Sequence, residues 1–261
     1  MTSPLLPGTA LVTGASSGIG EVYAEKLARR GYDLILVGRN TEKLATLAAQ
    51  LTGETGRTVE TLQADLANTS GIEIVEAKLR DDPAITLLVN SAGLLSNGPL
   101  AGADVTGLTD MLNVNVLALT RLASAAATAF AARKRGAIVN VASAMAFIDT
   151  PQTAAYGASK AYVLNLTLSL DLELAPHGVQ LQAVLPGYTR TPMIGGGANL
   201  PPEMVMDAGE MVDAALTGLD RHELVTIPSL EAVSGYDAWA KSRLALQPHL
   251  SLARPAARYA A

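Results

Sequence analysis

The chain contains no cysteine among its 261 residues, and this absence removes several kinds of chemistry. Disulfide bonds, thiolate nucleophiles and zinc–thiolate centres are excluded, because each requires Cys side chains. Only three histidines occur, His177, His222 and His249, and their wide spacing predicts no histidine-based metal site. We therefore expect no metal cofactor. A chain without Cys also fits a reducing cytoplasm, which is the location we expect.

Charged residues are scarce as well, at 16% of the chain, and they sum to a net charge of −5. A negative chain without an extended basic patch is a poor partner for nucleic acid. The one basic cluster, residues 133–135, precedes Gly136 and reads as the last turn of a helix. No uninterrupted apolar run reaches the ~20 residues of a membrane span. The segment 1–8 also lacks the pattern of a signal peptide. Since neither nucleic acid nor a membrane is indicated as a partner, we expect the partner to be a small molecule.

Short apolar segments alternate with amphipathic ones along most of the chain. Strands are predicted at residues 10–13, 33–37, 58–63, 85–90, 137–141 and 180–185. Helices are predicted at 19–30, 41–52 (capped by Thr41), 71–81, 109–133 and 154–175. Apolar strands separated by helices predict an α/β fold, a doubly wound parallel sheet between two helical layers. No linker divides the chain, so we expect one dinucleotide-binding catalytic domain over residues 1–261.

The regular alternation stops at Pro186. Residues 187–210 include three consecutive glycines, Gly195 to Gly197, and several prolines. This loop follows a strand end, where open α/β sheets bind ligands, and we interpret it as a substrate loop. The alternative is a tolerated surface insertion. Residues 229–261, with the only tryptophan, Trp239, are expected to form a C-terminal extension that contains a helix.

A glycine-rich turn joins the first predicted strand to the first helix. Its pattern, G-x-x-x-G-x-G, consists of Gly14, Ala15, Ser16, Ser17, Gly18, Ile19 and Gly20. Small residues allow the backbone to approach a pyrophosphate, and the helix N-terminus presents unpaired N–H groups to it. Glycines also serve ordinary tight turns, so the strand–turn–helix context is what favours a dinucleotide site.

The end of the second strand indicates which dinucleotide is bound. NAD-binding folds of this kind place a carboxylate there to hold the ribose hydroxyls. This chain has Gly38 and Arg39 instead. An arginine pairs with a 2′-phosphate that a carboxylate would repel, so Arg39 favours NADP(H). The alternative is a solvated surface arginine.

Four residues form a candidate catalytic set. Tyr156 and Lys160 are four positions apart and share a helix face, Ser143 follows the fifth strand, and Asn115 lies in the preceding long helix. Taken alone, each of the four also has a structural interpretation. The serine could cap a turn, the tyrosine could be a half-buried aromatic residue, the lysine could be solvated, and the asparagine amide could form hydrogen bonds with the backbone. Their joint occurrence favours catalysis.

With these motifs the sequence resembles the single-domain short-chain dehydrogenase/reductase family over about residues 8–192. The matching segments are residues 13–20, 65–66, 90–93 and 186–187, together with Asn115, Ser143, Tyr156 and Lys160. Ser91 departs from the family, which usually has asparagine there. The resemblance implies a Rossmann-like sheet of about seven strands. It also implies a homodimer or homotetramer formed through the helices at 109–133 and 154–175.

The resemblance further implies which residues contact the cofactor. Beside the glycine turn and Arg39, these are Asp65 and Leu66 at the adenine, Asn90, Ala92 and Gly93 at its ribose, Tyr156 and Lys160 at the nicotinamide ribose, and Pro186, Gly187, Thr189 and Thr191 near the nicotinamide. Asn115 is expected to anchor a water that relays protons.

The chemistry of this set is hydride transfer between NADP(H) and a carbonyl or alcohol. Nicotinamide supplies the hydride, and Tyr156 exchanges the proton with the substrate oxygen, held by Ser143. The ammonium of Lys160 is expected to lower the pKa of Tyr156 by about 1–3 units. Apolar residues near the site predict a hydrophobic ketone or aldehyde. The alternatives are a 3-oxoacyl-thioester reductase and a non-catalytic NADP(H)-binding sensor or scaffold.

Overall fold

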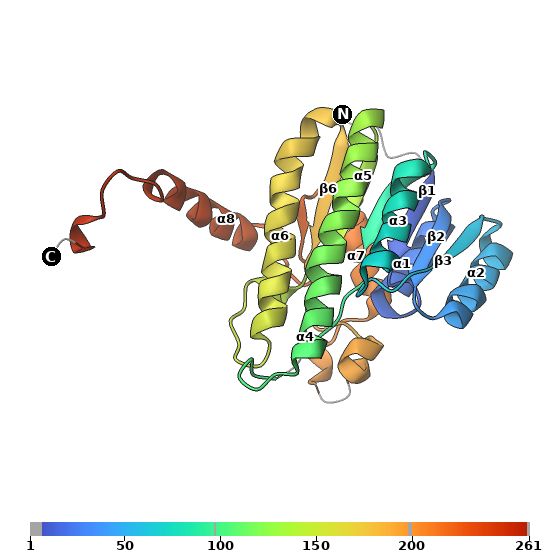
Figure 1. Cartoon of the computed structure of the whole chain (residues 1–261), viewed down its shortest axis with the longest axis horizontal. Coiled ribbons are helices and arrows are strands. Elements are labelled where there is room, and N and C mark those ends of the chain that lie inside the picture. The colour runs from blue at the N-terminus through green and yellow to red at the C-terminus, as the bar shows by residue number, and fades with distance from the viewer. Residues whose placement is uncertain (1–6, 97, 198–199, 260–261) are drawn as a thin grey trace. The chain divides into compact units, whose positions relative to one another are not determined.

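Seven parallel strands form one sheet in the order β3-β2-β1-β4-β5-β6-β7 (Figure 1). The strands are β1 (Thr9–Thr13), β2 (Asp33–Gly38), β3 (Val59–Gln63), β4 (Ile85–Asn90), β5 (Gly136–Val141), β6 (Val179–Val184) and β7 (Val225–Thr226). The structure, a computed structural model, describes residues 7–96, 98–197 and 200–259. Chain contacts divide it into two units, which we call the body (Met1–Pro228) and the tail (Ser229–Ala261).

Alternate residues of each central strand enter different apolar clusters. In β1, Ala10 and Val12 join one cluster and Leu11 joins the other. The first cluster is covered by α1 (Gly18–Arg29), α2 (Thr41–Thr55) and α7 (Ala208–Asp220), the second mainly by α3 (Thr69–Asp81) and α5 (Leu119–Arg133). A third cluster packs beneath α6 (Ala154–Leu174). The predicted three-layer, doubly wound sheet is thereby confirmed.

The predictions for β1 to β6 agree with the structure to within one residue, and the helix predictions differ most at the start of the long helix and at the end of α2, which reaches Thr55. Asn40, and not Thr41, caps α2, because the Asn40 side chain accepts a hydrogen bond from the backbone N–H of Lys43. The long helix begins at Val105 and not at Thr109, because Asp104 accepts hydrogen bonds from the N–H groups of Thr106 and Gly107. Both corrections follow from side-chain caps that hydrophobic periodicity does not report.

The predicted helix at 109–133 is interrupted where it passes the site. α4 (Val105–Leu112) leads into a π-helical segment, Asn113–Ala118, before α5 begins. Residues 105–133 form 29 residues of helix whose most apolar 18-residue window has a mean hydropathy of 1.4, so the helix is long and apolar enough to cross a membrane by length and composition. Half of the most apolar window is nevertheless buried in the body, as expected for a helix that packs into a core. The absence of a membrane span therefore stays a prediction.

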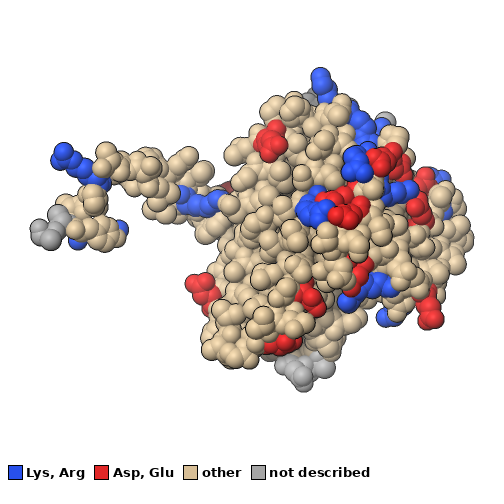
Figure 2. Space-filling model, in the orientation of Figure 1, with Lys and Arg blue, Asp and Glu red and all other residues tan. Residues whose placement is uncertain are grey.

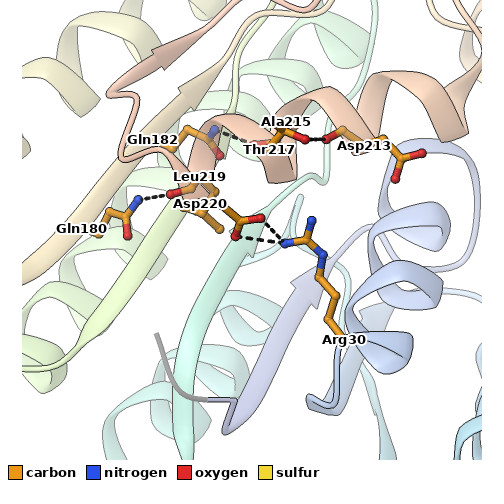
Figure 3. Close-up of polar contacts among 8 residues, drawn as sticks. All are labelled: Arg30, Gln180, Gln182, Asp213, Ala215, Thr217, Leu219 and Asp220. Atoms are coloured by element: carbon orange, nitrogen blue, oxygen red, sulfur yellow. Dashed lines mark hydrogen bonds and ion pairs between the residues drawn. The ribbon is translucent and has the colours of Figure 1, made fainter. Parts of the chain in front are cut away.

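Two glutamines of β6 fasten α7 to the sheet (Figure 3). Gln180 donates to the carbonyl of Leu219 at 2.6 Å and Gln182 to that of Ala215 at 2.8 Å. These carbonyls are one helical turn apart, matching the two-residue spacing of side chains on one face of a strand. On the other side of α7, Arg30 forms an ion pair with Asp220 at 2.9 Å. These contacts hold the C-terminal half of α7 in place. The loop between β6 and α7 therefore ends at an anchored helix.

The loop after β6 is partly ordered by hydrogen bonds with itself. Thr189 forms a parallel bridge with Met206, and short 3-10 turns span Pro192–Gly197 and Pro202–Met204. α7 begins at Ala208, inside the predicted loop of 187–210, capped by Asp207. The tail contains α8 (Ser234–Leu246), which agrees with the helix expected there.

Candidate active site

A groove with a cavity volume of about 200 Å³, open to solvent, lies at the carboxyl edge of β1, β2 and β4. Its predicted lining residues are Gly14, Ser16, Ser17, Gly18, Ile19, Gly20, Arg39, Asp65, Leu66, Ala92, Gly93 and Thr191. It is also lined by Val37, Gly38, Ala64, Ser91, Leu94, Val114, Pro192 and Met193. The structure therefore brings together twelve of the eighteen residues that were predicted to contact the cofactor.

The glycine turn needs its glycines for conformation and for space. Gly14 and Gly18 have φ angles of +68° and +61°, in the left-handed region that favours glycine. A Cβ on Gly14 would lie 2.9 Å from the Cα of Ala92, and one on Gly18 would lie 3.2 Å from the side chain of Thr191. Ser17 begins α1 without a side-chain cap, so first-turn N–H groups remain available. This cradle fits a pyrophosphate.

The adenine end of the groove lies between Arg39 and Asp65. Arg39 is exposed, and among the described residues no carboxylate forms an ion pair with its guanidinium. The Asp65 carboxylate accepts hydrogen bonds from the backbone N–H of Ala67 and the amide of Asn68, which fixes its orientation. The arginine can therefore receive a phosphate without first breaking an internal ion pair.

Ser143, Tyr156 and Lys160 converge at the ends of β5 and α6. A side-chain hydrogen bond links Ser143 to Tyr156. The Nζ of Lys160 lies 5.7 Å from the centre of the Tyr156 ring and donates to the carbonyl of Val141 at 2.9 Å. Ser143 also accepts from the N–H of Met145, so it caps the turn and contacts the phenol at once. The three side chains thus have the spacing of a proton-transfer site.

Burial alters the acidity of the tyrosine and the lysine. It raises the pKa of Tyr156, and the hydrogen bond with Ser143 lowers that pKa only in part. Burial also lowers the pKa of Lys160 to about 8, because the ammonium is removed from water. The expected lowering of the Tyr156 pKa by Lys160 is therefore wrong for the chain by itself. Its phenol remains protonated at neutral pH, which is the form a proton donor needs.

Asn115 lies in the π-helical segment and is fully buried. Its amide accepts from the N–H of Leu94 at 2.8 Å and donates to the carbonyl of Leu94 at 2.9 Å. It also donates to Ser159 at 3.2 Å, and Ser159 donates to the carbonyl of Tyr156 at 2.7 Å. Asn115 thus joins the loop after β4 to the catalytic helix. Its assignment to a proton-relaying water stays a prediction.

Gly93 connects the groove to the catalytic set. A Cβ at this position would lie 3.5 Å from the amide oxygen of Asn115 and 3.7 Å from the Nζ of Lys160. Gly93 also lines the groove. A cofactor that passes over Gly93 would therefore meet Lys160.

Some predicted cofactor residues lie elsewhere. The side chain of Asn90 is buried and donates to Asn140, and the groove lining does not include Asn90, Pro186, Gly187 or Thr189. Thr189 is buried, with its hydroxyl directed to the carbonyl of Gly187. Tyr156 and Lys160 are also absent from the groove lining, and cofactor contacts at all eighteen predicted positions stay predictions.

Sequence reasoning missed two polar residues that organise the site. The hydroxyl of Thr13 accepts from the N–H groups of Ser91 and Ala92, both at 3.0 Å, and holds the β4 loop against the glycine turn. Ser159, described above, lies between Tyr156 and Lys160 in sequence. Both are polar residues within segments that are otherwise buried, and this is the feature of the sequence that could have identified them.

Comparisons with known proteins agree with this geometry. The family model for short chain dehydrogenases matches residues 8–197. A solved short-chain dehydrogenase from Sphingobium yanoikuyae in complex with NADPH is 46% identical, with a TM-score of 0.92 over 97% of this chain and 100% of that one. A solved bulky-bulky ketone specific alcohol dehydrogenase from Comamonas testosteroni is 41% identical, with a TM-score of 0.91 over all of both chains.

A curated relative points to another substrate. The very-long-chain 3-oxoacyl-CoA reductase of Phaeosphaeria nodorum is 35% identical over 217 residues, which cover 81% of this chain and 63% of that protein.

Proposed function

The chain belongs to the short-chain dehydrogenase/reductase family, and from that premise we propose that it is an NADP(H)-dependent reductase of bulky, apolar ketones. The observation that carries the proposal is the Tyr156 phenol, hydrogen-bonded to Ser143 and near Lys160, whose Nζ in turn lies close to Gly93 in the lining of the groove. Support for NADP(H) comes from Arg39 and from the NADPH complex of the Sphingobium relative.

The proposed reaction converts a ketone to an alcohol by adding a hydride to carbon and a proton to oxygen. Bound NADPH supplies the hydride. Ser143 donates a hydrogen bond to the carbonyl oxygen and orients it, and Tyr156 transfers its phenolic proton to that oxygen. The ammonium of Lys160 then stabilises the phenolate, which regains a proton from solvent. The raised pKa of Tyr156 favours this direction over oxidation at neutral pH.

The substrate class follows from exposed apolar side chains on the segments that follow the catalytic strands. Phe147 and Ile148 lie just beyond Ser143, and Tyr188, Met193 and Met204 lie on the loop after β6. Residues 144–148 and 191–197 carry no charge, and the charged residues nearest to the named apolar side chains are Asp149, Arg190 and Glu203. Such a surface favours desolvation of an apolar substrate. The similarity to the Comamonas ketone enzyme supports the same class.

A spectrophotometric assay tests the proposed function. Purified protein, NADPH and ketones bearing two bulky substituents should give a steady loss of absorbance at the reduced-nicotinamide band, and a chelator should not change the rate. A 3-oxoacyl thioester is included because of the fungal relative. Preference for the thioester would favour that alternative. Tight NADPH binding without turnover of any ketone would favour a sensor or scaffold.

Arg39→Asp should reverse the cofactor preference. The guanidinium is expected to pair with the 2′-phosphate of NADP(H), and a carboxylate would repel that phosphate while it accepts the ribose hydroxyls. We expect kcat/KM for NADPH to fall by roughly 100-fold, because a lost charge-assisted contact and a new repulsion together cost about 3 kcal/mol. The exposed Arg80, replaced by Asp, is a matched control. An unchanged NADPH/NADH ratio would make Arg39 a bystander.

We also propose that the protein is a dimer or tetramer. The surface over α6 carries few charges (Figure 2), and Leu172, opposite the sheet-facing side of that helix, is 81% exposed. The hydroxyl of Tyr162 bonds to Thr120 and holds α6 against α5. Leu172→Arg should lower the mass measured by light scattering. A wild-type protein that is monomeric at micromolar concentration would contradict the proposal.

A further inference from the structure

The tail holds large apolar side chains that nothing within it covers. Its described residues, 229–259, include no buried residue. Exposed fractions reach 64% for Val233 and Leu244, 57% for Leu246 and 74% for Leu250. A segment shorter than ~40 residues rarely forms a core without disulfides or a partner, and this chain has no cysteine. The tail therefore requires another surface.

The apolar side chains of α8 point to more than one side of the helix. Trp239 and Leu246 are seven residues apart and share one side, because seven residues make about two turns. Leu244 lies about 140–160° away from both, at 100° per residue. A membrane surface or a single shallow groove can cover one side of a helix but not both. An interface with two walls would cover both.

Charge favours a second copy of this chain as the partner. Residues 229–261 hold four basic and two acidic side chains, a net charge of +2. Since the whole chain carries −5, the body carries −7. A basic tail is attracted to an acidic body, and every copy brings one of each.

The body completes its own core without the tail. The members of its three apolar clusters all precede Pro228, the latest being Ile227. The tail is nonetheless retained in two solved relatives, which align over 97% and 100% of this chain, whereas the family model ends at residue 197. A segment that the core does not need is thus kept in folded relatives.

We propose that the tail is a clasp that binds a second copy of this chain. In a two-fold assembly each contact occurs twice, and in the proposed one each tail lies between the body and the tail of its partner. Those two surfaces supply the two walls that α8 requires. Burial of Trp239, Leu244 and Leu246 against them would remove their apolar surface from water and so make the contact stable.

Photo-cross-linking of the full-length protein tests the clasp. The photoreactive residue p-benzoylphenylalanine replaces Leu244, and a second substitution places it at the exposed Lys43 of the body as a control. Irradiation of the Leu244 protein should give a product of twice the chain mass on a denaturing gel, and the control should not. Mixed light and heavy-isotope copies should yield cross-linked peptides of mixed isotope, from the tail of one copy and the body or tail of another. Cross-links confined to one chain, or none, would overturn the proposal.

A pair of variants measures the contribution of the apolar side. Trp239→Asp with Leu246→Asp should lower the yield of the double-mass product by roughly tenfold or more, because each substitution removes more than the ~1.4 kcal/mol that corresponds to a factor of ten. Gln247→Asp adds a charge at the end of the same helix without removing an apolar side chain, and should leave the yield unchanged. An equal yield in all three proteins would contradict the clasp.

Discussion

Tyr156→Phe should reduce ketone turnover by roughly 10³-fold while NADPH binding changes little. General acid catalysis by a positioned side chain contributes about 10²–10⁴-fold, and Phe has no proton to donate. The ring and its packing are kept, and among the residues that the structure describes the phenol shares a side-chain hydrogen bond with Ser143 alone. The defect is therefore expected in kcat, with the fold and the cofactor groove preserved.

Steady-state kinetics and NADPH fluorescence titration measure the two quantities separately. Tyr162→Phe is a matched control, since this half-exposed tyrosine of the same helix bonds to Thr120 away from the site. It should retain turnover within about twofold, as surface substitutions usually do. Turnover of the Tyr156 variant at the wild-type rate would remove the phenol from the mechanism. Loss of NADPH binding would instead assign Tyr156 a structural role.

The central fold could be predicted from the sequence because the strands are buried on both faces. In β4 and β5 every residue is buried, and such continuous apolar runs are easily recognised. β7 was not located, because a strand of two residues has no periodicity to detect. Its pairing with β6 comes from tertiary contacts that sequence patterns do not contain.

The candidate catalytic residues could be proposed from the sequence because their spacings are diagnostic. The contacts that hold these residues in place could not be proposed in this way. The π-helical segment at Asn115 and the Ser159 bridge both join elements distant in the chain. The position of the Asn90 amide could not be predicted either, because it donates to Asn140 across two neighbouring strands. Which buried polar groups pair with each other depends on strand order, and a single sequence reveals strand order only through resemblance.

Lys160→Met should abolish activity and yet stabilise the protein. Lys160 is 5% exposed, and burial lowers its pKa in the folded chain to about 8, below the usual lysine value of 10.5. The shift of about 2.5 units corresponds to a destabilisation on the order of 3 kcal/mol. Met fills a similar volume without charge, and it loses one hydrogen bond to Val141, which is worth about 1–2 kcal/mol. The larger effect is the desolvation, so we expect a net gain of about 1–2 kcal/mol.

The pH dependence separates this explanation from ordinary repacking. Below pH 8 both the folded and the unfolded wild-type chain hold the Lys160 proton, so the full penalty is present there. Between pH 8 and 10.5 the unfolded chain binds more protons, so wild-type stability rises with pH and the penalty disappears. The gain in the variant should therefore be large at pH 7 and vanish near pH 10.5, where the lost hydrogen bond leaves it slightly less stable. Denaturant unfolding at both pH values measures this, with the exposed Lys43→Met as control. An equal gain in stability at both pH values would mean that the buried ammonium does not destabilise the wild-type protein. Lys160 would then need no bound cofactor to hold its charge.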